Sequence, residues 1–136
     1  MLLLVLQKRG NELKTEVADG LTVFGDTDLL SQVMANLIQN ANAHTENGGI
    51  LLSAVRDGGT IIITVRDNGS GISPELLPRV FERGVSDGGT GFGLFLCKTV
   101  VESHGGRIWI ESKPGCGTTA HFALPVYEGQ HGGNAA

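Results

Sequence analysis

The sequence predicts an α+β fold, a two-layer sandwich in which one mixed, mainly antiparallel sheet carries helices on a single face. Two pairs of β-forming segments flank glycine-rich turns, at Asp57-Gly58-Gly59 and at Pro114-Gly115-Cys116-Gly117, which is typical of hairpins. Two longer segments, 26–44 and about 91–104, show helical periodicity instead. Helices that are apolar on one side must bury that side, and the apolar face of a sheet is the natural partner.

Each element has a local signal. Strands are expected at 12–18, 21–24, 50–56, 60–67, 107–112 and 118–124, with the first two joined in a hairpin at Asp19-Gly20. Helices are expected at 2–9, 26–44 and about 91–104, and a short one from Ser73-Pro74. Asp26 is the expected N-cap of the second helix. Residues 1–125 would form one domain, and the small, polar residues 126–136 a disordered tail.

Composition excludes several classes of protein. The chain has 136 residues and a formal net charge of -4, which disfavours a nucleic-acid-binding surface. The two cysteines, Cys97 and Cys116, are too few for a disulfide scaffold, so we expect reduced thiols and a cytoplasmic protein. The apolar run 2–6 precedes its basic residues and is far shorter than the roughly 20 residues of a membrane helix.

The most informative stretch is Asp67-Asn68-Gly69-Ser70-Gly71-Ile72, which follows a strand of β-branched residues. A carboxylate at the end of a strand accepts hydrogen bonds from an amine, and the two glycines allow close approach of the backbone. The stretch therefore predicts a site for a planar ligand with a polar edge.

The helix at 26–44 contains an asparagine pair. Asn40 falls inside its apolar arc, and Asn36 lies one turn earlier at the edge of that arc. A buried amide without partners costs about 1–3 kcal/mol. Both amides either bond to neighbouring backbone or line a polar pocket, where their oxygens would bind a hard cation or phosphate.

A second glycine cluster, Gly88-Gly89-Thr90-Gly91-Phe92-Gly93-Leu94, precedes the helix at about 91–104. Backbone N–H groups at a helix start form an anion site. The cluster is neither a Walker A loop nor a dinucleotide-binding fingerprint, because the required lysine and third glycine are missing. Taken alone, it is equally well explained as a flexible linker.

In this order, the motifs resemble the catalytic ATP-binding domain of sensor histidine kinases, within the GHKL group that includes gyrase, Hsp90 chaperones and MutL proteins. The resemblance covers about residues 2–125. Segment 33–41 is similar to the family's N box, 67–72 to its first G box, 80–83 to its F box and 89–94 to its second G box. The resemblance implies the Bergerat-type version of the predicted sandwich.

The resemblance also implies roles for matching residues. Asp67 would accept the adenine amine, with Gly69 and Gly71 making room for the base and Thr118 lining the adenine side. Asn40 would bind Mg²⁺, with Asn36 nearby. The phosphates would lie at the second glycine cluster, on Gly89, Thr90, Gly91, Gly93 and Leu94. Residues 73–89 would form a lid anchored by Phe81. The implied cofactors are ATP and Mg²⁺.

One position separates members of the group. ATP-hydrolysing relatives and anti-sigma-type serine kinases carry a glutamate as general base where this chain has Asn36, and an amide cannot take a proton. This favours a histidine kinase, whose acceptor imidazole is already nucleophilic. No histidine of this chain has the family's acceptor context, so the acceptor would lie on a separate dimerisation domain of the same sensor. A response regulator would be an indirect partner, and the isolated domain a monomer.

The chain departs from the pattern at the phosphate end. Ala43 stands where the family often has a phosphate-binding cation, and the lid is short. The remaining candidate phosphate contacts are His44, Arg83 and Lys98, which are otherwise explained as a packed histidine and two solvated charges. This departure motivates one alternative, a degenerate nucleotide-binding or interaction module without phosphotransfer. An anti-sigma-type serine kinase is the other alternative.

Overall fold

The computed structural model describes residues 10–17, 21, 23, 25–82 and 93–126. Its strands are β1 Glu12–Val17, β2 Gly49–Asp57, β3 Thr60–Asp67, β4 Arg107–Ser112 and β5 Thr118–Pro125. Its helices are α2 Thr27–Ala43 and α3 Gly93–Ser103, with a short 3-10 helix η1 at Leu77–Arg79. The expected helix at 2–9 and the tail from residue 127 lie outside the described residues.

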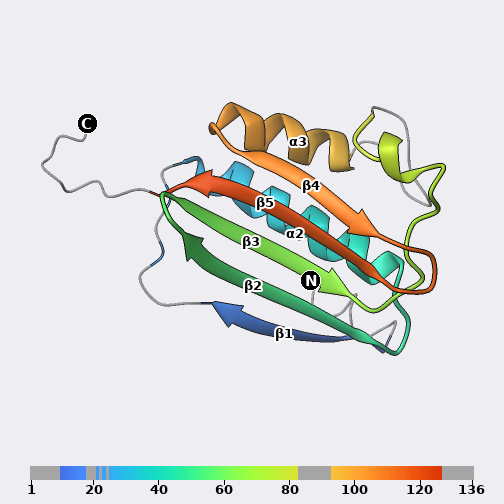
Figure 1. Cartoon of the computed structure of the whole chain (residues 1–136). Coiled ribbons are helices and arrows are strands. Elements are labelled where there is room, and N and C mark those ends of the chain that lie inside the picture. The colour runs from blue at the N-terminus through green and yellow to red at the C-terminus, as the bar shows by residue number, and fades with distance from the viewer. Residues whose placement is uncertain (1–9, 18–20, 22, 24, 83–92, 127–136) are drawn as a thin grey trace, which may run out of the picture.

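The five strands form one sheet in the order β1-β2-β3-β5-β4. β1 runs parallel to β2, and the other neighbours are antiparallel. Both helices lie on the same side of this sheet, as Figure 1 shows. α2 contacts β2 and β3, and α3 contacts β4 and β5. This arrangement confirms the predicted two-layer α+β fold.

The sheet also shows where local signals succeeded and failed. The two predicted glycine turns connect β2 to β3 and β4 to β5, as expected. The predicted hairpin of 12–18 with 21–24 is wrong, because β1 pairs with β2 instead and Val23 forms an isolated bridge with Val126. Pairing with β2 packs Leu13 against the core. A local turn signal contains no information about such a contact with a distant segment.

The helices begin and end close to their predicted limits. The Asp26 side chain caps α2 by accepting the Leu29 N–H at 3.0 Å, and His44 is the C-cap. Leu29 itself, in the first turn of α2, is 39% exposed. The short helix expected from Ser73 is also wrong: a turn precedes η1, whose Pro78 lacks the N–H that a longer helix requires.

The core lies between the helices and the sheet. Its buried residues come from both helices and the three central strands: Val33, Leu37, Ile38, Ala41, Ile50, Val65, Cys97, Val101, Ala120, Phe122 and Leu124. Both cysteines are free, as predicted, with Cys97 buried and Cys116 exposed. Burial raises the pKa of the Cys97 thiol to about 11, so it acts as an apolar core residue.

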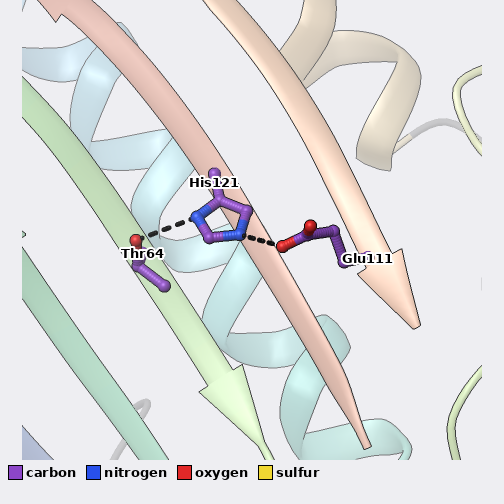
Figure 2. Close-up of polar contacts among 3 residues, drawn as sticks. All are labelled: Thr64, Glu111 and His121. Carbon is purple, nitrogen blue, oxygen red and sulfur yellow. Dashed lines mark hydrogen bonds and ion pairs between the residues drawn. The ribbon is translucent and has the colours of Figure 1, made fainter. Parts of the chain in front are cut away.

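The other face of the sheet is not covered by helices in the part of the chain that the structure describes. There the His121 ring lies between Thr64 Oγ1, 3.1 Å from Nδ1, and Glu111 Oε1, 2.8 Å from Nε2, as Figure 2 shows. Trp109 stacks on His121, with ring centroids 4.9 Å apart. His121 therefore points away from the helices and helps to join β3, β5 and β4.

Among the described residues, no helix has the length and apolar character that a membrane span requires.

Candidate functional site

The site is centred on Asp67, the last residue of β3. Only 5% of its surface is exposed. Its Oδ1 accepts the Gly69 N–H at 2.9 Å and the Thr118 N–H at 3.3 Å. β3 therefore delivers the carboxylate, while the loop that follows it and the neighbouring strand β5 supply two backbone donors. These donors fix the direction of the carboxyl group before any ligand arrives.

The surroundings of Asp67 have opposing effects on the pKa of its carboxyl group. Burial raises the pKa of the carboxyl above its usual 3.8, and this is the largest effect. The N–H groups of Gly69 and Thr118, the nearby His44 and the Thr45 side chain act against it, because each favours the charged form. A buried carboxylate of this kind gains free energy from a further donor, such as the amine of a ligand.

The loop after Asp67 is tied to the C-terminal end of α2. The His44 carbonyl accepts the Ser70 N–H at 2.9 Å. Gly69 passes so close to this carbonyl that a Cβ there would collide with it. The adjacent Asn68 side chain accepts the Gly49 N–H at 2.9 Å. The predicted glycine requirement at Gly69 thus has a structural cause, the close contact with α2.

The same loop is also tied to the turn between β4 and β5. Gly71 has a φ of +79°, and a Cβ there would collide with the Lys113 carbonyl. The Ser70 carbonyl accepts the Gly115 N–H at 2.7 Å. Next to it, Ser112 Oγ accepts the Ile72 N–H at 2.8 Å. Both predicted glycines, Asp67 and Thr118 are therefore brought together at one end of the sheet.

The sequence motifs missed two residues of this region. Thr45 is 1% exposed and reaches Asp67 through its side chain. Ser112 Oγ contacts the Gly117 carbonyl at 2.9 Å and Thr118 Oγ1 at 2.8 Å. In sequence, Ser112 is distinguished only by its place at the end of a strand and Thr45 only by its place directly after the helix C-cap His44, and neither signal is specific.

The asparagines of α2 have different environments. Asn36 and Asn40 are both half-buried, and the Asn36 side chain hydrogen-bonds with the Cys97 thiol. The deeply buried amide is Asn42, which the periodicity did not single out: it is 2% exposed, and its Oδ1 accepts from Asn11 Nδ2 at 2.7 Å. Asn11 also donates to the Thr45 carbonyl at 2.8 Å. This buried pair fixes the end of α2 beside Asp67.

The phosphate end is only partly described. Gly89, Thr90, Gly91 and Arg83 lie outside the described residues, whereas Gly93 and Leu94 form the first residues of α3. In Figure 1 the start of α3, the end of α2 and the end of β3 lie at the same end of the molecule. The start of α3 therefore lies at the same end of the molecule as the end of β3, whose last residue is Asp67.

Two of the candidate phosphate contacts, Lys98 and His44, lie near other side chains of the protein. Lys98 Nζ lies 3.9 Å from Glu102 Oε2 and 5.7 Å from the centre of the Phe81 ring. His44 lies close enough to Asp67 to lower the pKa of that carboxyl. His44 is thus on the Asp67 side of the site, and the Lys98–Phe81 contact ties α3 to the segment that follows η1.

The donor set bears on which metal the site suits. No group of three or more His, Cys, Asp or Glu side chains gathers to hold a metal within the described ranges. The oxygen ligand that we expect on α2 is the half-buried amide of Asn40. Mg²⁺ usually keeps water and substrate phosphates among its ligands and uses one or two protein oxygens. A single amide fits such an ion, whereas it does not fit a metal held by the protein alone.

Known proteins resemble this chain in sequence. The model of the family described as "Histidine kinase-, DNA gyrase B-, and HSP90-like ATPase" matches residues 25–128. The adaptive-response sensory kinase SasA of Parasynechococcus marenigrum is 39% identical over 90% of this chain, and the sensor-like histidine kinase SenX3 of Mycobacterium bovis is 42% identical over 85%. These alignments cover 34% of SasA and 30% of SenX3, so the chain spans about a third of each relative.

Solved structures share the fold. The catalytic domain of the histidine kinase ThkA has a TM-score of 0.79 and 31% identity, covering 88% of this chain and 83% of that one. The mycobacterial sensor histidine kinase MprB has a TM-score of 0.81 and 30% identity, covering 92% and 89%. The family model, the sequence relatives and these structures all indicate the same family. The chain therefore belongs to the family of histidine kinase-, DNA gyrase B- and HSP90-like ATPase domains, and within it to the catalytic domains of sensor histidine kinases.

Proposed function

We propose that this domain binds ATP with Mg²⁺ and transfers the γ-phosphoryl group to a histidine on a separate dimerisation domain of the same sensor. The observation that carries the proposal is the buried Asp67 carboxylate, held by two backbone N–H groups at the end of β3. An adenine amine is the donor that such a carboxylate suits. The full-length kinase ShkA, similar in fold with a TM-score of 0.79, was solved in complex with AMPPNP.

Each part of the site would have one task. Asp67 and Thr118 would bind the base, with Gly69 and Gly71 giving the loop its close path. Asn40 would hold Mg²⁺, which supplies positive charge to the phosphates, and Asn36 would lie beside it. The phosphates would lie at the start of α3, on Gly93 and Leu94 together with Gly89, Thr90 and Gly91. Any contribution of His44, Arg83 or Lys98 to phosphate binding would be secondary.

The reaction would be a direct transfer. The imidazole nitrogen of the acceptor forms a bond to the γ-phosphorus, the bond from that phosphorus to the β-phosphate oxygen breaks, and ADP leaves. The imidazole loses its proton to solvent or to a base on the acceptor domain. The task of this chain is to position ATP and to stabilise phosphate charge. Asn36 supplies no general base for water, which favours transfer to histidine over hydrolysis.

The proposed setting follows from the substrate. ATP and a response regulator that receives the phosphoryl group are both found in the cytoplasm, so we place the domain there. A sensor of this kind would carry its dimerisation helices and its sensing part outside residues 1–125. The domain on its own would be a monomer.

Phosphotransfer is tested by mixing the purified domain with ATP, Mg²⁺ and the cognate dimerisation domain. We expect an acid-labile phosphohistidine on the dimerisation domain, and none when its acceptor histidine is replaced by glutamine. Tight ATP binding without transfer, even with the two domains fused in one chain, would contradict the proposal and support the degenerate module.

Adenine recognition is tested by Asp67→Asn. Removing the charged acceptor should weaken ATP binding by about 1.5–3 kcal/mol, or roughly ten- to 150-fold, by calorimetric titration. The matched control is Asp57→Asn at the exposed end of β2, which should bind ATP as the parent does.

The same variant separates binding from folding. The folded-state pKa of Asp67 lies above 3.8, so the ionised carboxyl costs stability at pH values above that pKa, and the cost disappears as pH falls below 3.8. Asp67→Asn should therefore unfold at the same temperature as the parent or higher at neutral pH. Unchanged ATP affinity in this folded variant would refute the adenine assignment.

Metal binding is tested by Asn40→Ala, with Gln39→Ala at the exposed neighbouring position as control. ATP affinity measured with and without Mg²⁺ should differ in the parent and in Gln39→Ala. The difference should be lost in Asn40→Ala, because the metal would lose its protein ligand. If Asn40→Ala retained the full Mg²⁺ dependence, its assignment as ligand would be wrong.

A further inference from the structure

Ser112, the last residue of β4, lies outside every motif of the sequence, yet it joins three parts of the site. Its Oγ accepts the Ile72 N–H at 2.8 Å from the loop after Asp67. It donates to the Gly117 carbonyl at 2.9 Å. It also lies 2.8 Å from Thr118 Oγ1. A single hydroxyl therefore contacts the loop, the turn before β5 and the first side chain of β5.

The chemistry of these partners fixes where the protons lie. The Ile72 N–H can only donate, and the Gly117 carbonyl can only accept. A serine hydroxyl has one proton and two acceptor lone pairs. The proton of Ser112 is used by Gly117 and one lone pair by Ile72, so only the second lone pair is left for Thr118. The Thr118 hydroxyl must therefore donate its proton to Ser112.

This direction decides what Thr118 can offer a ligand. With its own proton bound to Ser112, the Thr118 hydroxyl has only acceptor capacity left. Thr118 and Asp67 are directly opposite each other in the pairing of β3 with β5, so their side chains share one face of the sheet. They are 6% and 5% exposed. The ionised Asp67 carboxylate also only accepts, so two neighbouring groups present acceptors alone.

We propose that Ser112 is a positioning residue for base recognition: it holds Thr118 as an acceptor, so that the pocket prefers a purine with a 6-amino group over one with a 6-oxo group. Two acceptors side by side suit an amine, which has two protons, and oppose a carbonyl oxygen. A Thr118 hydroxyl released from Ser112 could turn its proton toward that oxygen. The inference rests on the proposed binding of the nucleotide base at Asp67.

The test is the ratio of ATP affinity to ITP affinity, because ITP differs from ATP in carrying a 6-oxo group in place of the amine. The parent domain should prefer ATP. Ser112→Ala should lower the ratio by roughly two- to tenfold, the worth of one ordinary hydrogen bond. Ser112→Thr, which keeps a hydroxyl, should keep the ratio. Thr119→Ala, on the opposite face of β5, should leave it unchanged as the matched control.

The effect of Ser112→Ala in a protein that already carries Thr118→Val shows whether Ser112 acts through Thr118. In Thr118→Val, which lacks the hydroxyl, adding Ser112→Ala should leave the ratio as it is, whereas a merely structural role would alter it again. Thr118→Val alone should lower the ratio, so the inference is testable even if Ser112→Ala does not fold. If the parent binds ATP, this inference alone is overturned by either of two results. One is an ATP-to-ITP ratio that is unchanged in Ser112→Ala, and the other is a ratio that is raised in Thr118→Val. A parent that binds neither nucleotide overturns the proposed function as well.

Discussion

The site depends on one interaction, the capture of a buried carboxylate by backbone N–H groups. Asp67 lies at the end of a central strand, where burial opposes its charge and the N–H groups of Gly69 and Thr118 support it. The two effects leave a carboxylate that is fixed in direction but gains free energy from another donor. A ligand amine supplies that donor without further rearrangement, which is how a folded domain lowers the cost of ordering its binding site.

Holding Asp67 in place requires several distant segments. The loop after it packs on the His44 carbonyl at the end of α2, and the buried pair of Asn11 and Asn42 fixes that end against β1. On its other side, the loop bonds to Ser112 and Gly115 between β4 and β5. Contacts beside both edge strands, β1 and β4, thus support a carboxylate at the end of the central strand β3. We infer that these two sets of contacts, to the end of α2 and to the turn between β4 and β5, hold the Asp67 carboxylate in position for a ligand.

The sequence predicted what short-range patterns encode. The hairpin turns, the Asp26 cap and the fold class follow from periodicity and turn chemistry, and the fold is confirmed by the structure and by its similarity to histidine kinase catalytic domains. The pairing of β1 with β2, the burial of Asn42 against Asn11 and the contact of Ser112 with Ile72 were not predictable, because each depends on segments more than 30 residues apart. The roles of Asp67, of Asn40 and of the second glycine cluster in binding the nucleotide are proposals.

The most direct test of this account is the pKa of Asp67, followed by NMR of its side-chain carboxyl carbon with and without saturating ADP. In the free domain the pKa should lie above 3.8, because burial is the largest effect there. With ADP bound the pKa should be lower, because the carboxyl is already buried and the adenine amine adds a hydrogen bond to its charged form. The same pKa with and without ADP would contradict the central claim that Asp67 receives the base.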